Sequence, residues 1–287
     1  MTDNELPQDS AALVVEGATT STAPTRADGP IRLPARHNPT LQEVIRLVNA
    51  DPELHALWKC ANVNAVDRLG MSDHGPVHVQ IVANIALKLL RILVDAGQEP
   101  SIVRHYGLTV LDAEVVVVLG GLLHDVGMAI HREGHEEFSL FLVEPKIREL
   151  LGGVYDEPEL TVIASEALQA IISHRAGGEP FSLEAGIVRV ADALDMAEGR
   201  SRIPFERGRV SMHSLSAAAI DQIRIEDGEE KPIRIEILMN NSSGLYQVDG
   251  LLKAKLTGSG LEPYVEVIAH IDTEAEKRLV PIYRLET

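Results

Sequence analysis

The sequence has little cysteine, few aromatic residues and fewer basic than acidic side chains. Cys60 is the only cysteine, which excludes an internal disulfide and a zinc site built from cysteines. Aromatic residues make up 3% of the chain, so leucine, isoleucine, valine and alanine must form the core. The formal net charge of -17 argues against a large nucleic-acid groove. A small phosphate ester remains compatible with this charge, because bound metal ions can supply the positive charge at a site.

Long apolar segments and leader sequences are also missing. The longest apolar run, residues 113–123, contains Glu114 and is too short to cross a bilayer. The first residues lack the basic start and apolar stretch that are typical of a signal peptide. We therefore expect a cytoplasmic protein that makes no membrane contact.

The periodicity of apolar residues divides the chain into three parts. Residues 1–36 are polar and aperiodic, which predicts a disordered tail. Residues 37–203 follow helical periodicity, with helices predicted at 41–49, 52–68, 77–96, 113–123, 136–151, 160–173 and 183–196. Residues 204–287 alternate at 232–239 and 264–271 as half-buried strands do, and helices are predicted at 214–222 and 245–256. The sequence thus predicts a mainly α protein, an all-helical domain followed by a small α+β domain for effector binding or dimerisation.

Histidine and aspartate occur inside otherwise apolar helices. His124 and Asp125 end one such helix (LLHDVGM), and Asp192 lies in another (IVRVADALD). An ionised aspartate is costly to bury unless it is paired or binds a cation. His78 begins an amphipathic helix, and His174 follows an apolar run. Four segments thus each supply an imidazole or carboxylate, which suits Zn, Mn, Fe or Mg. The alternative is that Asp125 caps the next turn and His124 is a hydrogen-bonded core residue.

This ordered set of histidines and aspartates resembles the HD superfamily of phosphohydrolases. The matching segments are HGPVHVQIVANIA, LLHDVGM and VRVADALD, and the resemblance covers residues 70–203. It implies an all-helical HD metal-binding domain over residues 37–203. Within that domain the resemblance makes four residues the ligands of a first metal ion: His78, His124, Asp125 and Asp192.

A second likeness is to the HD-GYP enzymes, through the segment IISHRAGGEPFSLEAGIVRVADALD. His135 opens a helix (HEEFSLFL) much as a metal-binding histidine does in that group. The likeness implies a second metal ion bound by His135 and His174, with Asp125 bridging the two ions. The expected cofactors are therefore one or two divalent ions from among Mn, Fe, Zn, Mg and Ni. GEP replaces the GYP tripeptide, which argues against cyclic-dinucleotide cleavage.

The spacing of His74 and His78 resembles that in the cyclic-nucleotide phosphodiesterases, although the flanking Asp73 and Gly75 differ. The resemblance implies that His74 donates a proton to the leaving group; the alternative is a surface or capping role before the helix. His131 and Arg175 are expected to contact substrate phosphate. For both residues the alternative is an ordinary solvated side chain.

Together these features predict a metal-dependent phosphohydrolase, a phosphomonoesterase or a phosphodiesterase. The expected substrate is a nucleotide or a related small phosphorylated metabolite, attacked by water that a binuclear metal site activates. Two alternatives are open: a di-iron oxygenase built on the same ligands, and a regulatory module that senses a nucleotide. A homodimer is a further expectation.

Overall fold

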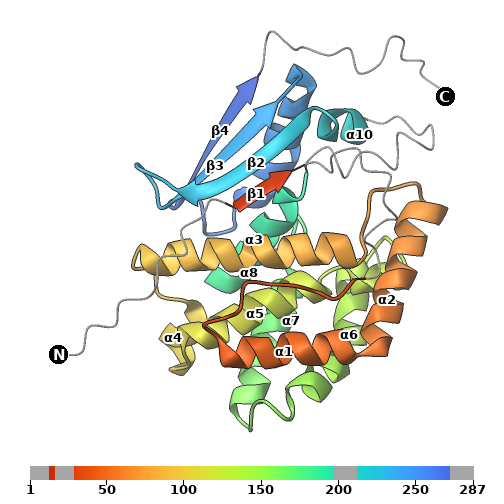
Figure 1. Cartoon of the computed structure of the whole chain (residues 1–287), viewed down its shortest axis with the longest axis vertical. Coiled ribbons are helices and arrows are strands. Elements are labelled where there is room, and N and C mark those ends of the chain that lie inside the picture. The colour runs from red at the N-terminus through yellow and green to blue at the C-terminus, as the bar shows by residue number, and fades with distance from the viewer. Residues whose placement is uncertain (1–12, 17–28, 197–211, 272–287) are drawn as a thin grey trace.

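The computed structural model describes residues 13–16, 29–196 and 212–271. Figure 1 shows a group of packed helices with a small sheet lying against one side, next to helix α3. Isoleucines of the sheet and apolar residues of the helices belong to one hydrophobic core. The predicted fold class, a helical domain followed by a small α+β part, is confirmed. The predicted domain boundary near residue 203 lies outside the described residues.

The helical part follows the predicted order, with two short helices that were not predicted, α4 and η2. Asn38, Asp51, Thr109 and Ser182 accept hydrogen bonds from free backbone N–H groups at helix starts, the usual role of an N-cap residue. The helices are α1 (Pro39–Ala50), α2 (Pro52–Asn62), η1 (Val63–Arg68), α3 (Pro76–Asp95), α4 (Ser101–Tyr106), α5 (Val110–Leu123), η2 (Val126–Ala129), α6 (His135–Leu151), α7 (Glu159–Ile172) and α8 (Leu183–Leu194).

Helix α5 is the centre of the helical part and is buried from Ala113 to its end. It contacts α3, α7 and α8, and its glycines allow close approach. A Cβ at Gly121 would lie 2.8 Å from the Cα of Ala83 in α3, so the two backbones come close here. The indole of Trp58 donates a hydrogen bond to the Leu122 carbonyl (2.9 Å). The end of α5, which carries the His-Asp pair, is thereby fixed in the middle of the protein.

The sheet has four strands in the order β1 (Leu13–Glu16), β2 (Ile220–Asp227), β3 (Ile233–Met239) and β4 (Val265–Ile271). The first three are antiparallel neighbours, whereas β3 and β4 are parallel. Alternate residues of β3 are buried, so the isoleucines share one face, as the sequence pattern predicts. Helix α10 (Met212–Ala217) precedes β2; η3 (Ser242–Gly244), η4 (Tyr246–Leu252) and α11 (Lys253–Leu256) connect β3 to β4.

Two predictions are wrong in part. Residues 13–16 of the expected disordered tail form β1, which pairs with β2 more than 200 residues later. Ile31 is also ordered, because its backbone exchanges two hydrogen bonds with the Asn49 side chain. The helix expected at 214–222 ends at Ala217 and gives way to β2, where Ile220, Ile223 and Ile225 are buried on one strand. The helix predicted at 245–256 is confirmed by η4 and α11.

Among the described residues, α3 is the one helix whose length and apolar composition could cross a membrane. In this protein 61% of its apolar window is buried against other elements. Residues on several of its faces, including Val79, Ile85 and Leu90, are inaccessible to solvent. This is the burial of a core helix, as in a soluble protein.

Candidate metal centre

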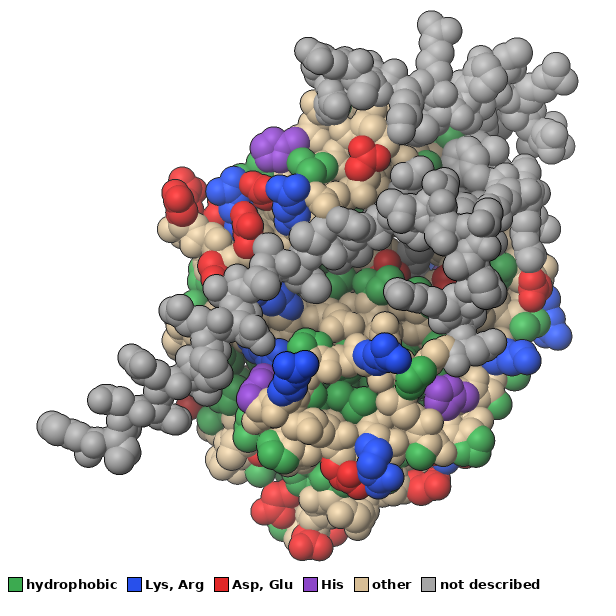
Figure 2. Space-filling view, viewed as in Figure 1, with side chains coloured by type: hydrophobic (Ala, Val, Ile, Leu, Met, Phe, Trp, Pro, Cys, Tyr) green, Lys and Arg blue, Asp and Glu red, His purple; other side chains and the backbone are tan. Residues whose placement is uncertain are grey.

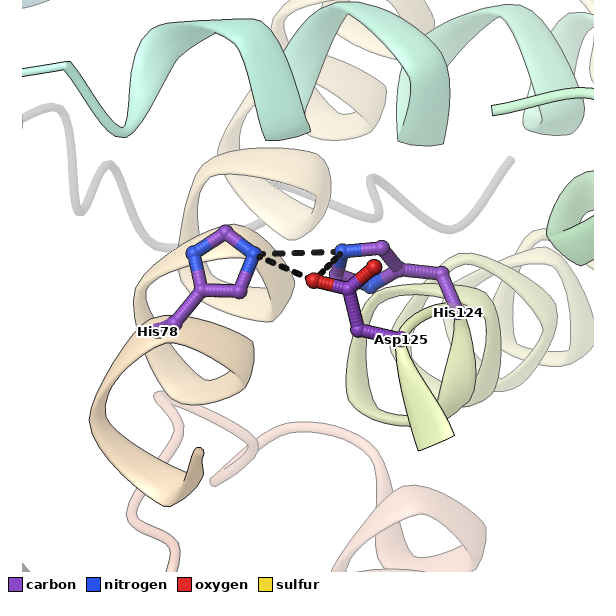
Figure 3. A group of neighbouring side chains, drawn as sticks. All are labelled: His78, His124 and Asp125. Carbon is purple, nitrogen blue, oxygen red and sulfur yellow. Dashed lines mark hydrogen bonds and ion pairs between the residues drawn. The ribbon is translucent and has the colours of Figure 1, made fainter. Parts of the chain in front are cut away.

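The structure brings the six predicted ligand residues together from five segments of the helical part. His78 lies in the first turn of α3, and His124 and Asp125 follow the end of α5 (Figure 3). The other three are contributed by the start of α6, the end of α7 and the last turns of α8: His135, His174 and Asp192. Each of the six belongs to at least one group of three whose potential ligand atoms lie within 4.8 Å of one another.

The first cluster surrounds the Nε2 atoms of His78 and His124, which are 3.2 Å apart. Asp125 Oδ2 lies 3.3 Å from the first of these atoms and 3.4 Å from the second. Asp192 Oδ1 lies 3.4 Å and 3.7 Å from the same two nitrogens. Ligands bound at about 2.1 Å to one ion are themselves about 3.0–3.4 Å apart, so this spacing fits a metal site.

The second cluster contains His135 and His174, whose Nε2 atoms are 3.2 Å apart. The other carboxylate oxygen of Asp125, Oδ1, lies 3.2 Å from His135 Nε2 and 3.8 Å from His174 Nε2. The two oxygens of Asp125 therefore face different clusters. This is the geometry of a carboxylate that can bridge two ions.

The outer nitrogen of each histidine ring is held by a hydrogen-bond acceptor. Nδ1 of His124 donates to the Gly121 carbonyl (2.9 Å), and Nδ1 of His174 donates to the Ile171 carbonyl (2.7 Å). Carbonyls in the last turn of a helix lack a partner within the helix, so a histidine just beyond the end can bind one. The other two rings bond in the same way to Arg132 O (His135, 3.0 Å) and Asp195 Oδ2 (His78, 2.6 Å).

Because carbonyl and carboxylate oxygens accept hydrogen bonds, the hydrogen of each neutral ring lies on Nδ1 and the lone pair of Nε2 points into the centre. Outer partners of this kind are typical of metal-binding histidines. Sequence reasoning missed Asp195, which holds His78. Its only signal is its position three residues after Asp192, near the end of the same helix.

The charges at the site depend on one another. Burial lowers the pKa of the His124 ring, but the carboxylates of Asp125 and Asp192 outweigh it and raise this pKa to about 9. Despite their burial, both carboxyl groups have a pKa well below the ordinary value, because His124 lies beside Asp125, and Lys255 with His124 beside Asp192. Burial, together with the charges of His124 and Lys255, lowers the pKa of His174 well below its usual value. Asp125 and Asp192 are therefore ionised, and the positive charges of His124 and Lys255 lie beside them.

The donor atoms fit divalent metal ions. The first cluster offers two imidazole nitrogens and two carboxylate oxygens, and the second offers two nitrogens and one oxygen. Such mixed nitrogen and oxygen sets suit Zn, Mn and Fe and leave coordination positions for water or substrate oxygens.

His74 lies beside the first cluster rather than in it. Its ring is buried, with Nε2 4.0 Å from Asp125 Oδ2 and Nδ1 2.8 Å from the Ser72 carbonyl. Asn62 orders this segment by accepting a hydrogen bond from the His74 backbone N–H and donating one to Asp73. The ring is therefore held in one orientation next to the bridging carboxylate.

The two predicted phosphate contacts lie outside the clusters. His131 is exposed, and its Nδ1 accepts a hydrogen bond from the backbone N–H of Glu133 (3.0 Å). Arg175 is also largely exposed and pairs with Glu136 Oε1 (2.9 Å). The other oxygen of Glu136 lies 3.1 Å from His135 Nδ1, so Arg175 lies near the second cluster without contacting it. The roles of His131 and Arg175 in substrate binding stay predictions.

Fold and site together define a helical domain with a buried histidine and aspartate centre suited to divalent metal ions. A family model described as "HD domain" matches residues 77–197, which include all six ligand residues. The chain belongs to the HD domain family, whose members bind divalent metal ions and are generally hydrolases. It is 40% identical over 222 residues to the uncharacterized protein MJ1020 of Methanocaldococcus jannaschii, covering 77% of this chain and 86% of that protein. No solved structure matches the chain.

Proposed function

We propose that this protein is a metal-dependent phosphohydrolase with a binuclear centre, acting on a nucleotide or a related small phosphorylated compound. One observation carries the proposal: the two oxygens of Asp125 face two separate clusters of imidazole nitrogens. A carboxylate in this position can hold two divalent ions close enough to act on one phosphoryl group.

Each ligand residue has a place in this scheme. His78, His124 and Asp192 would hold one ion, His135 and His174 would hold the other, and Asp125 would bind both. When bound, the ions would lower the pKa of a water molecule that attacks phosphorus and would neutralise charge on the phosphoryl oxygens. The ion could be Mn, Fe, Zn, Mg or Ni, since the donor set does not select among them.

His74 is positioned to act as the general acid. Its Nδ1 is held by the Ser72 carbonyl, so Nε2 is the atom that faces Asp125. In its protonated form this ring can donate its Nε2 proton to the leaving oxygen of an ester. Ring burial limits exchange of this proton with bulk water.

A small substrate is favoured by the charge of the surface as well as by the site. On the described part of the face in Figure 2, Lys and Arg side chains are spread among acidic and uncharged ones. Together with the net charge of -17, this supports a phosphorylated metabolite over a nucleic acid. A cytoplasmic location and a homodimer are further parts of the proposal.

The test is turnover by the metal-loaded protein. Purified protein is loaded in turn with Mn, Fe, Zn, Mg and Ni, and each sample is assayed against phosphomonoesters and phosphodiesters. We expect turnover that a chelator abolishes and that Asp125→Asn lacks. Binding of a nucleotide without turnover would contradict the proposal in favour of a sensing module. Oxygen consumption by the iron-loaded protein alone would favour a di-iron oxygenase.

A further inference from the structure

A lysine from the C-terminal part of the chain contacts the metal centre. Lys255, on α11, forms an ion pair through Nζ with Asp192 Oδ2, while Asp192 Oδ1 faces His78 and His124. Both side chains of the ion pair are largely buried. Within the described parts of the chain, Lys255 is the one lysine or arginine that pairs with a carboxylate of the two clusters. The two oxygens of Asp192 therefore have different partners.

The segment that carries Lys255 is attached to the same helix as Asp192. Arg189, three residues before Asp192 on α8, is 3% exposed and donates from Nη2 to the carbonyls of Ala254 and Thr257 (both 3.1 Å). These two carbonyls flank Lys255. The same guanidinium also donates to the carbonyls of Ala176 and Gly178, in the loop after His174.

A glycine allows this segment to approach α8 closely. A Cβ at Gly186 would overlap the carbonyl oxygen of Ser259, so only glycine fits against the segment. Gly186, Arg189 and Asp192 follow one another at intervals of three residues, so they share one face of the helix. That face thus binds the C-terminal segment at two points and carries the metal-facing carboxylate at a third.

We propose that Lys255 belongs to the metal centre as a positioning residue for Asp192, held there by the attachment of its segment to α8. This inference rests on the metal centre of the proposed function. A carboxylate can rotate to present either oxygen or both. The ammonium group binds Oδ2, which keeps Asp192 as a one-oxygen ligand directed at His78 and His124.

Whether removal of Lys255 weakens or tightens metal binding tests this role. Removing the partner that orients a ligand typically weakens metal binding about 10- to 100-fold. A lysine that only repelled the cation would have the opposite effect, because its removal would tighten binding. The sign of the change therefore separates orientation from simple repulsion.

The experiment is a calorimetric titration of metal-free protein with Mn²⁺. We expect Lys255→Met to weaken binding about 10- to 100-fold and Lys255→Arg to restore most of it. Lys253→Met is the matched control, since Lys253 lies on the same helix but pairs with Asp249 at the exposed surface. It should bind Mn²⁺ like the wild type. In an Asp192→Asn background, Lys255→Met should have no further effect, because its partner is already lost.

A second variant tests the attachment without touching the ion pair. Gly186→Ala should displace the segment and weaken Mn²⁺ binding in the same direction, whereas Gly153→Ala, where a Cβ meets no neighbour, should not. Unchanged or tighter binding by Lys255→Met, or a full effect in the Asp192→Asn background, would overturn the inference. If the wild type itself bound no Mn²⁺, the proposed function would fail as well. Wild-type binding with an unchanged Lys255→Met variant would reject this inference alone.

Discussion

Adding one methyl group at Gly121 tests how the helices hold the metal centre. A Cβ at this position would lie 2.8 Å from the Cα of Ala83 and 3.0 Å from its N atom. Both are backbone atoms of α3, so no side-chain rotation relieves the overlap. Ordinary contact begins near 3.4 Å, so Gly121→Ala must move α3 and α5 apart by about 0.6 Å.

This displacement acts directly on the first cluster. His78 lies five residues before Ala83 on α3, His124 lies three residues after Gly121, and their Nε2 atoms are 3.2 Å apart. Overpacking of a core costs about 1–3 kcal/mol, which sets the expected fall in the free energy of unfolding. Functional sites need their groups placed within about 0.5 Å, so metal affinity should also weaken, by about tenfold or more.

Gly153→Ala is the control, because a Cβ at Gly153 meets no neighbour within 4 Å. We expect a smaller loss of stability there and unchanged metal affinity. Urea unfolding in the presence of a chelator gives the stability without the metal contribution, and calorimetry gives the affinity. If Gly121→Ala lost stability yet bound metal like the wild type, the spacing of α3 and α5 would not be what holds the site.

Three further predictions test single side chains. Asp125→Asn should lose both ions and all turnover, which metal analysis and an esterase assay measure on one preparation; normal occupancy would refute the bridging role. His74→Ala should retain its metal but lose about 10²–10⁴-fold in turnover on alkyl esters and much less on nitrophenyl esters. Equal losses would exclude a general acid. Burial raises the pKa of Glu114, but hydrogen bonds from Arg91 and Asn38 outweigh it and hold that pKa below its ordinary 4.5. The ionised Glu114 carboxylate therefore stabilises the fold above the unfolded pKa, and this stabilisation is lost as the pH falls through the lower folded pKa. In Glu114→Gln the urea midpoint should therefore change less with pH on the acid side than in the wild type. The exposed Glu43→Gln should reduce this pH dependence less.

The helices were predictable because their signals are local. Apolar residues recur at helical spacing in 77–96 and 183–196, and polar capping residues precede several starts. Strands β1 and β2 were not predicted, since their stability depends on pairing between segments some 200 residues apart. The four residues of β1 carry no periodicity of their own that distinguishes them from a polar tail. The alternation of β2 begins directly after a segment with helical character.

The ligand residues were predictable from a local conflict, a charged or polar side chain within an apolar helix. Asp125 and Asp192 show it most clearly, because burying either without a partner is costly. The division into two clusters was implied only by family resemblance, since it depends on distances between five segments. Lys255 carried no signal, because it lies 63 residues after Asp192 in a segment of different character.

Anomalous X-ray diffraction from crystals of the Mn²⁺-loaded protein would show whether Asp125 joins two metal ions. We expect two anomalous peaks about 4 Å apart. One should lie among His78, His124 and Asp192, the other between His135 and His174, with one oxygen of Asp125 bound to each. A single peak, or Mn²⁺ bound without Asp125, would contradict the bridging role.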